Sequence, residues 1–101
     1  KKGAPTKWDF NNNLRLYALV KGIQYSRPNM SRKEIFNYLP SAAQETLLKD
    51  IIKPVTKPST LETRYDKYLG SSEFKTIEAI LKNRSEQEKQ ELFQHILENK
   101  L

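Results

Sequence analysis

The stretch that decides the fold is residues 10–23, FNNNLRLYALVKGI. Its apolar residues recur at the spacing of one helix face and then spread sideways into a broad stripe: Phe10, Leu14, Leu16, Tyr17, Ala18, Leu19 and Val20. A surface helix needs only one narrow apolar stripe, whereas a helix at the centre of a bundle is apolar over most of its circumference. The sequence therefore predicts an all-α bundle around a central helix over residues 10–23, which Gly22 and the Pro28-Asn29 turn should end.

Several segments along the chain carry the signature of a helix start. A Ser that is followed three residues later by Glu or Gln satisfies two backbone N–H groups reciprocally at a helix N-terminus. Apolar residues at helical spacing follow each occurrence of this pattern, at Ser31, Ser41, Ser59 and Ser85. We also expect Asp9 and either Ser71 or Ser72 to cap two further helices.

The apolar repeats between these caps predict a compact bundle of five to six short helices. Pro40 should end the second helix, and a third should follow over residues 41–53, before Pro54. The fourth should end with Gly70 as its C′ residue, and its apolar residues are Leu61, Tyr65, Tyr68 and Leu69. Two more repeats, over residues 74–81 and 92–97, predict a helical C-terminal part.

The positive charge of the chain is concentrated near its beginning. The formal net charge of the 101 residues is +6. Residues 1–33 contain one acid, Asp9, and eight bases, so they carry +7 and the remainder carries −1; the bases are Lys1, Lys2, Lys7, Arg15, Lys21, Arg27, Arg32 and Lys33. Such asymmetry indicates an anionic partner, either nucleic-acid phosphate or an acidic protein surface.

The residue types that catalysis and metal binding require are sparse. There is no Cys, His95 is the only His, and the three glycines are too far apart to form a phosphate-binding loop. We therefore expect no enzymatic activity, no cofactor, no metal and no small-molecule substrate. The lack of Cys is typical of a reducing compartment. No apolar run approaches the length of a membrane span, so no membrane partner is expected.

The outer face of the fourth helix is the candidate binding surface. When the apolar stripe of this helix points inward, four residues spaced i, i+3, i+4 and i+7 point outward: Thr60, Thr63, Arg64 and Lys67. A recognition helix presents such a face to the DNA major groove, where an Arg can bind guanine through two hydrogen bonds. Phosphate contacts are expected from Lys21, Arg27, Arg32 and Lys33. Glu62 and Asp66 make the helix nearly neutral, which also suits a protein-docking surface.

At these positions the sequence resembles Myb/SANT repeats, which are DNA-binding helix-turn-helix domains. Trp8, Leu16 and Val20 match the spacing of their first helix, Ile35 and Leu39 match the second, and residues 60–69, TLETRYDKYL, match the third. The chain is most similar to the single Myb domains of telomeric repressor-activator proteins.

The Myb resemblance implies a domain organisation. A three-helix, helix-turn-helix-like core would occupy residues 7–70, with an insertion at 41–57. The end of a linker would precede it at 1–6, and a helical extension would follow at 71–101, all within a single helical domain. Arg64 and Lys67 would face DNA or a partner, with Leu61, Tyr65 and Leu69 inside.

A second resemblance is to the middle domain of ubinuclein, a histone-chaperone subunit. That domain also opens with a Trp-led amphipathic helix, has a later helix that runs into a Lys-Pro step, here Lys53-Pro54, and places an Arg ten residues beyond, here Arg64. This resemblance implies contacts with histones, DNA or other chaperone subunits.

These observations predict a nuclear, chromatin-associated module with DNA as its partner. Two alternatives remain open. One is a protein-interaction module of a histone-chaperone or chromatin complex, which binds an acidic protein or a chaperone subunit. The other is a structural or dimerisation domain that uses the apolar residues of the last helix: Leu92, Phe93, Ile96, Leu97 and Leu101.

Overall fold

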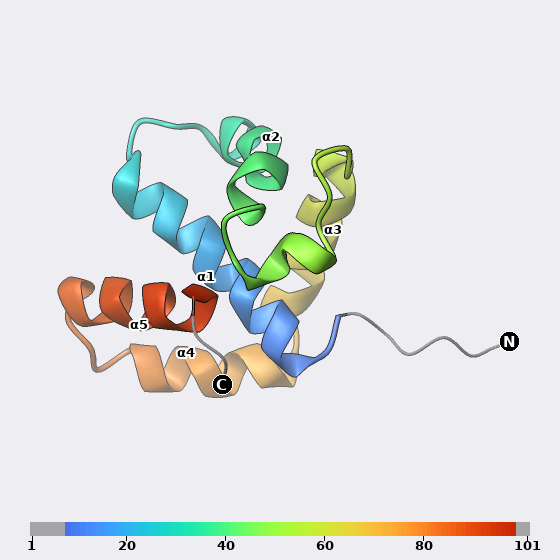
Figure 1. Cartoon of the computed structure of the whole chain (residues 1–101). Coiled ribbons are helices and arrows are strands. Elements are labelled where there is room, and N and C mark those ends of the chain that lie inside the picture. Colours follow the sequence, from blue (N-terminus) through green and yellow to red (C-terminus); the bar gives the residue numbers. More distant parts are fainter. Residues whose placement is uncertain (1–7, 99–101) are drawn as a thin grey trace, which may run out of the picture.

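A computed structural model describes residues 8–98, and within that range the chain forms five α-helices, one 3₁₀ helix and no strand (Figure 1). The elements are α1 (Phe10–Ser26), α2 (Arg32–Ala43), η1 (Leu47–Asp50), α3 (Pro58–Leu69), α4 (Ser72–Leu81) and α5 (Glu86–Glu98). The all-α prediction is confirmed. No helix in the described part is long and apolar enough to cross a membrane.

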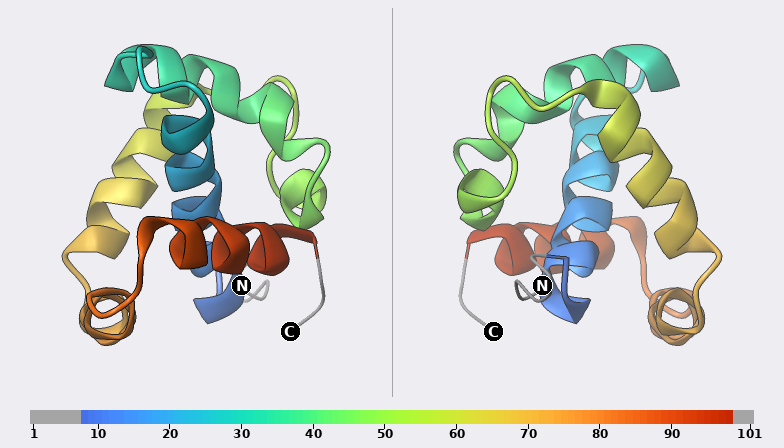
Figure 2. Two further views of the ribbon diagram at one scale, coloured as in Figure 1. Left: turned by 90° about the vertical axis from the view of Figure 1, so that its left-hand side faces the viewer. Right: turned by 90° about the vertical axis from the view of Figure 1, so that its right-hand side faces the viewer.

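Helix α1 is the central element of the bundle. It contacts α2, η1, α3 and α5, and the two side views show these elements arranged around it (Figure 2). Leu16 and Ala18 have no exposed surface and Val20 is 1% exposed, as the broad apolar stripe predicts. Helix α1 passes through Gly22 and continues to Ser26, because a glycine weakens a helix by only about 1 kcal/mol.

One aromatic cluster joins four of the helices. The ring of Tyr17 on α1 contacts Tyr65 and Tyr68 on α3, with ring centroids 6.1 and 6.2 Å away. It also meets Phe74 on α4 edge-on at 4.9 Å and Phe93 on α5 at 5.7 Å. A single continuous hydrophobic core therefore extends through the bundle.

Four of the predicted helix caps are confirmed. The Asp9 carboxylate accepts a 2.9 Å hydrogen bond from the backbone N–H of Asn12, and the Ser71 hydroxyl accepts one from Phe74. The two complete capping boxes are those of Ser31 with Glu34 and Ser85 with Glu88. In each box the serine hydroxyl accepts from the glutamate N–H, and the glutamate carboxylate accepts from the serine N–H.

The predictions around Pro40 and residues 41–53 are wrong. Helix α2 passes through Pro40 and ends at Ala43, and the expected third helix is only the short η1. Leu39, Pro40 and Ala43 are all buried, so packing outweighs the hydrogen bond that proline cannot donate. The amide of Gln44 then donates to the carbonyls of Pro40 and Ile52, at 2.9 and 2.6 Å, and this holds residues 44–52 in a folded-back loop.

The start and end of α3 also differ from expectation. Lys57 is the N-cap residue and Pro58 occupies the first turn, so Ser59 lies inside the helix and caps nothing. Proline is favoured there because its fixed φ suits a helix start and its missing N–H would have no partner. Gly70 caps the C-terminus with φ −90° rather than in the left-handed conformation of a C′ glycine.

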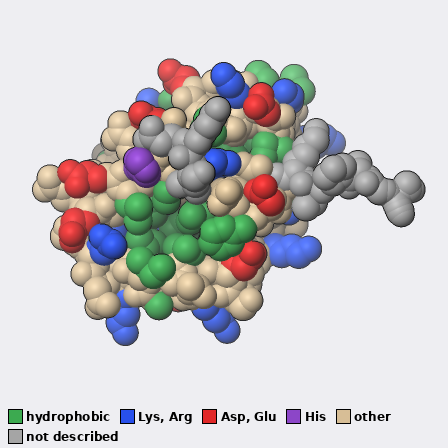
Figure 3. Space-filling model, turned by 60° about the horizontal axis from the view of Figure 1, so that its bottom comes forward, with side chains coloured by type: hydrophobic (Ala, Val, Ile, Leu, Met, Phe, Trp, Pro, Cys, Tyr) green, Lys and Arg blue, Asp and Glu red, His purple; other side chains and the backbone are tan. Residues whose placement is uncertain are grey.

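Helices α4 and α5 form the face that Figure 3 turns toward the viewer, on which hydrophobic side chains gather. Ile80 is 49% exposed, whereas Phe93, Ile96 and Leu97 of α5 are buried in the molecule's own core. Most of the apolar residues that suggested dimerisation therefore have intramolecular partners. Leu101 lies outside the described residues.

Candidate nucleic-acid interface

Helix α3 has the orientation that its sequence predicts. Leu61, Tyr65 and Tyr68 are buried, and Leu69 is half-buried. The predicted outer residues Thr60, Thr63 and Lys67 are exposed, and Arg64 is half-buried at the edge of this surface. We call the surface formed by Thr60, Thr63, Arg64 and Lys67 the α3 face.

Arg32 controls the charge along one edge of the α3 face. Its Nε lies 2.5 Å from Oε2 of Glu62, and its Nη2 lies 2.7 Å from Oδ1 of Asp66. The same guanidinium sits over the rings of Phe36 and Tyr65. The hydrogen bonds that Arg32 donates to Asp66 and Glu62 raise the pKa of its guanidinium above the usual value. One cation thus holds the two carboxylates that would otherwise repel phosphate from α3.

Arg64 forms the opposite edge of the α3 face. Its guanidinium carbon lies 4.9 Å from the ring centroid of Trp8, which directly precedes the Asp9 cap of α1. Arg64 and Lys67 also line a hollow of about 140 Å³ together with Ser71 and Glu73. The contact with Trp8 restricts the long arginine side chain and ties α3 to the start of α1.

Two further lysines lie near the N-terminus of α3. Lys33 on α2 and Lys57, the N-cap residue, line a shallow hollow of about 370 Å³ that includes Ser59 and Glu62. A helix N-terminus carries a partial positive charge, so these lysines add to an existing electrostatic preference for anions. Lys57 is absent from the predicted site, because it belongs to the loop and not to the periodic pattern of the helix.

The other two predicted phosphate contacts lie elsewhere. The Lys21 ammonium is 5.7 Å from the ring centroid of Tyr17, beside α4 and α5. Arg27 follows the end of α1, and its guanidinium lies 4.7 Å from the ring centroid of Tyr38. The structure therefore gathers six of the eight predicted residues around α3 and separates Lys21 and Arg27 from them.

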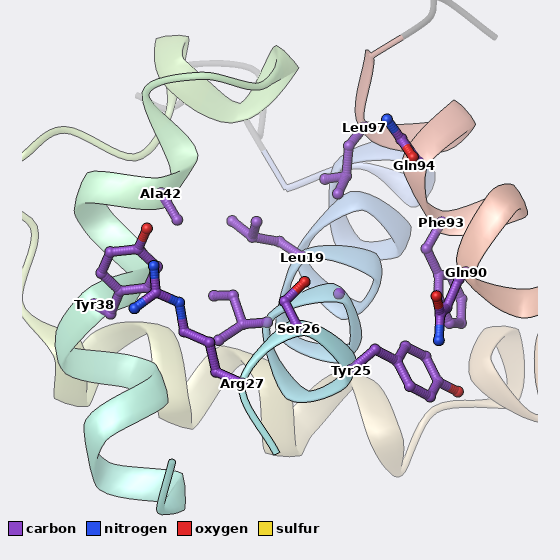
Figure 4. A pocket seen from close by; sticks show the side chains of 12 residues that line it. Leu19, Tyr25, Ser26, Arg27, Tyr38, Ala42, Gln90, Phe93, Gln94 and Leu97 are labelled. Carbon is purple, nitrogen blue, oxygen red and sulfur yellow. The ribbon is translucent and has the colours of Figure 1, made fainter. Parts of the chain in front are cut away.

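Arg27 belongs to a different feature, a largely apolar pocket of about 360 Å³ between α1, α2 and α5 (Figure 4). Figure 4 shows Arg27 and Tyr38 on one side of this pocket and Phe93 and Leu97 on the other, with Leu19 between them. The pocket joins residues from distant parts of the sequence.

Comparison with known protein families, with curated proteins and with solved structures finds no match for this chain. The resemblances to Myb/SANT and ubinuclein domains therefore remain predictions. Among residues 8–98, no group of His, Asp and Glu side chains is arranged to hold a metal ion.

Proposed function

We propose that this domain is a nuclear, chromatin-associated DNA-binding module that binds duplex DNA through the α3 face. The observation that carries the proposal is the pairing of Arg32 with both Glu62 and Asp66. The pairing leaves Arg64 and Lys67 as the two cations of α3 that have no ion pair within residues 8–98, although the helix is nearly neutral in sequence. The face then suits the negative potential of DNA.

The two basic residues of the α3 face and the two lysines near the N-terminus of α3 each have a proposed role. Lys67, Lys57 and Lys33 contact backbone phosphates, since an exposed ammonium binds phosphate without reading sequence. Arg64 reads a base edge. A guanidinium that rests on an aromatic ring uses its face for that contact and keeps its in-plane N–H groups for a guanine. Trp8 thereby reduces the entropy that Arg64 loses on binding.

The first test is a titration of a fluorescent duplex by anisotropy at about 50 and 200 mM salt, a range over which phosphate-dominated binding falls steeply. The Lys57→Gln/Lys67→Gln variant should bind more weakly. The slope of its log affinity against log salt concentration should also be shallower, by the equivalent of roughly one to two phosphate contacts. The matched control for the loss of two charges is Lys49→Gln/Lys53→Gln, because both lysines are exposed and neither lines the hollows beside α3. No binding by the unmodified domain at low salt would refute the proposal.

A second test isolates the role of Arg32. Arg32→Gln should weaken binding more than Lys33→Gln does, because it removes one cation and also releases two carboxylates onto the α3 face. Adding Glu62→Gln and Asp66→Gln to that variant should restore most of the affinity. A triple variant that binds as weakly as Arg32→Gln would instead make Arg32 a direct phosphate contact.

Base reading has its own variant. Arg64→Lys keeps the charge and loses the bidentate geometry, so it should lower affinity for a selected sequence by about 1–3 kcal/mol and leave random duplex nearly unaffected. An equal loss on all sequences would limit Arg64 to phosphate contact.

The apolar pocket of Figure 4 favours a second candidate function, docking of a chromatin protein. Its apolar walls and Arg27 at its rim suit an apolar side chain next to an acidic residue. The test is a peptide with an apolar side chain next to an acidic residue, titrated against the domain and against its Ala42→Glu variant. Ala42 lines the pocket and is half-buried, so a glutamate there should block the peptide. This candidate replaces DNA binding if the duplex titration is negative and the peptide binds the domain but not the variant.

A further inference from the structure

A second basic surface lies between α1, α4 and α5, away from the α3 face. It is a groove of about 600 Å³ that is lined by residues of all three helices. Helix α1 provides Lys21 and Tyr25, helix α4 provides Lys75, the C-cap residue of α4 is Lys82, and helix α5 provides Lys89. The volume falls within the range of roughly 300–1,000 Å³ that is usual for small-molecule sites.

The charge in this groove is strongly unbalanced. Four of its lining residues are lysines and one, Glu78, is acidic. Of the four, Lys89 is the one with an ion pair inside the described part of the chain, 3.3 Å from Glu86. Even with Glu78 and Glu86 counted, the groove carries a net charge of +2. Converging lysines repel one another, and a polyanion between them would relieve that repulsion.

The electrostatic influence of these lysines extends to Glu86 at the end of the groove. A hydrogen bond from the Tyr25 hydroxyl lowers the pKa of the Glu86 carboxyl most, and Lys89 and Lys21 lower it further. Lys21 on α1 and Lys89 on α5 therefore both stabilise the charge of the same carboxylate, that of Glu86.

The groove also has an aromatic wall. Tyr25 is half-buried, and its ring stacks on Phe93 with centroids 6.3 Å apart and an interplanar angle of 19°. Phe93 is fully packed in the core, so Tyr25 is held against a rigid support. A supported aromatic ring beside several lysines offers stacking to a planar base as well as charge to phosphates. Glu78 adds an acceptor for hydroxyl or amino groups.

We propose that this groove binds a nucleotide, with its phosphates held by Lys21, Lys75, Lys82 and Lys89 and its base placed against Tyr25. The site shares no residue with the α3 face. A nucleotide could therefore occupy the groove while the α3 face holds DNA.

The test is isothermal titration of the full chain with ATP, tripolyphosphate and adenosine. ATP should bind, and Lys75→Gln/Lys82→Gln should weaken it by roughly tenfold or more, since both side chains would lose charge-assisted contacts. Both lysines are exposed, so the substitutions leave the core untouched. The matched control Lys49→Gln/Lys53→Gln removes two exposed charges outside the groove and should leave ATP affinity unchanged.

The base contact is tested separately from the phosphate contacts. Tyr25→Leu should reduce ATP affinity to that of tripolyphosphate, and backbone amide signals of Ala79 and Lys82 should shift on addition of ATP in a nuclear magnetic resonance titration. Failure of ATP to bind at millimolar concentration would overturn the proposal, as would equal loss in the control variant. Equal affinity of the unmodified domain for ATP and tripolyphosphate would overturn the nucleotide assignment.

DNA binding is measured in parallel so that the two proposals can fail independently. Lys75→Gln/Lys82→Gln should bind duplex DNA as the unmodified domain does. Weaker DNA binding by this variant, with no ATP binding by either protein, would assign the groove to the DNA backbone and overturn the nucleotide site.

Discussion

Individual side chains in this bundle follow their sequence period, but their partners often come from far along the chain. The inward position of Tyr65 and the outward position of Lys67 are predictable from helical spacing alone. The pairing of Arg32 with Glu62 and Asp66 joins residues thirty or more positions apart. That contact depends on how α2 packs against α3, which no local pattern contains, and it changes the charge of the candidate site.

Tyr68 provides a prediction at this scale. Its ring is 3% exposed and packs against Tyr17 and Phe74, but its buried hydroxyl has no hydrogen-bond partner in the described structure. Tyr68→Phe keeps the ring contacts and removes the unpartnered hydroxyl. The free energy of unfolding at pH 7, measured with denaturant, should stay unchanged or rise by about 1 kcal/mol. Tyr68→Ala should lower the free energy of unfolding by about 3–5 kcal/mol. A comparable loss in Tyr68→Phe would show that the hydroxyl makes a stabilising hydrogen bond.

At the scale of helices, a start signal is reliable when no stronger signal lies beside it. Ser31 and Ser85 form the predicted capping boxes, and both follow ordinary loop residues. Ser41 and Ser59 each follow a proline, and in both cases the proline lies inside the helix. At Pro40 the burial of α2 decides the outcome, and at Pro58 the preference of proline for the first turn decides it. All four serines have a Glu or Gln three residues later, so this pattern alone does not distinguish the two outcomes.

This contrast predicts different effects for the same substitution. Ser31→Ala should lower the free energy of unfolding by about 1 kcal/mol, because the N–H of Glu34 loses its acceptor. Ser59→Ala should change it by a few tenths at most, since Ser59 is exposed in the first turn and alanine favours the helix. Thermal or denaturant unfolding of both variants measures the difference. Equal destabilisation by the two substitutions would instead indicate that Ser59 caps α3.

For the whole molecule, the class of fold is readable from the sequence but the grouping of surfaces is not. Periodicity and caps identify the helices, and the broad stripe of α1 identifies the central one. The groove of Lys21, Lys75, Lys82 and Lys89 needs three helices in their final arrangement, so counting charges along the chain misses it. The loop over residues 44–57 is equally hidden, because the buried Leu48 and Ile52 that anchor it have the spacing of a helix.

The shared aromatic core also determines how the molecule responds to alkaline pH. Burial raises the pKa of Tyr65 and of Tyr68 to about 12, and it raises the pKa of Tyr17 as well. In the unfolded chain these phenols titrate near pH 10. Between about pH 10 and 12 the native state therefore retains protons that the unfolded chain has lost, so stability falls as pH rises. Below pH 10 both states are protonated, and the contribution is fully present.

The expected loss for Tyr65 and Tyr68 together is roughly 2–3 kcal/mol per pH unit over that range, since each retained proton contributes about 1.4 kcal/mol. Both rings are almost fully buried, at 5% and 3% exposure, so solvent screens this effect little. Denaturant unfolding at intervals from pH 8 to about pH 11.5 measures the slope. The Tyr65→Phe/Tyr68→Phe variant is the control, because lysines also lose their charge in this range. Its slope should be clearly shallower than that of the unmodified domain, and identical slopes would show that the two phenols do not drive the alkaline loss of stability.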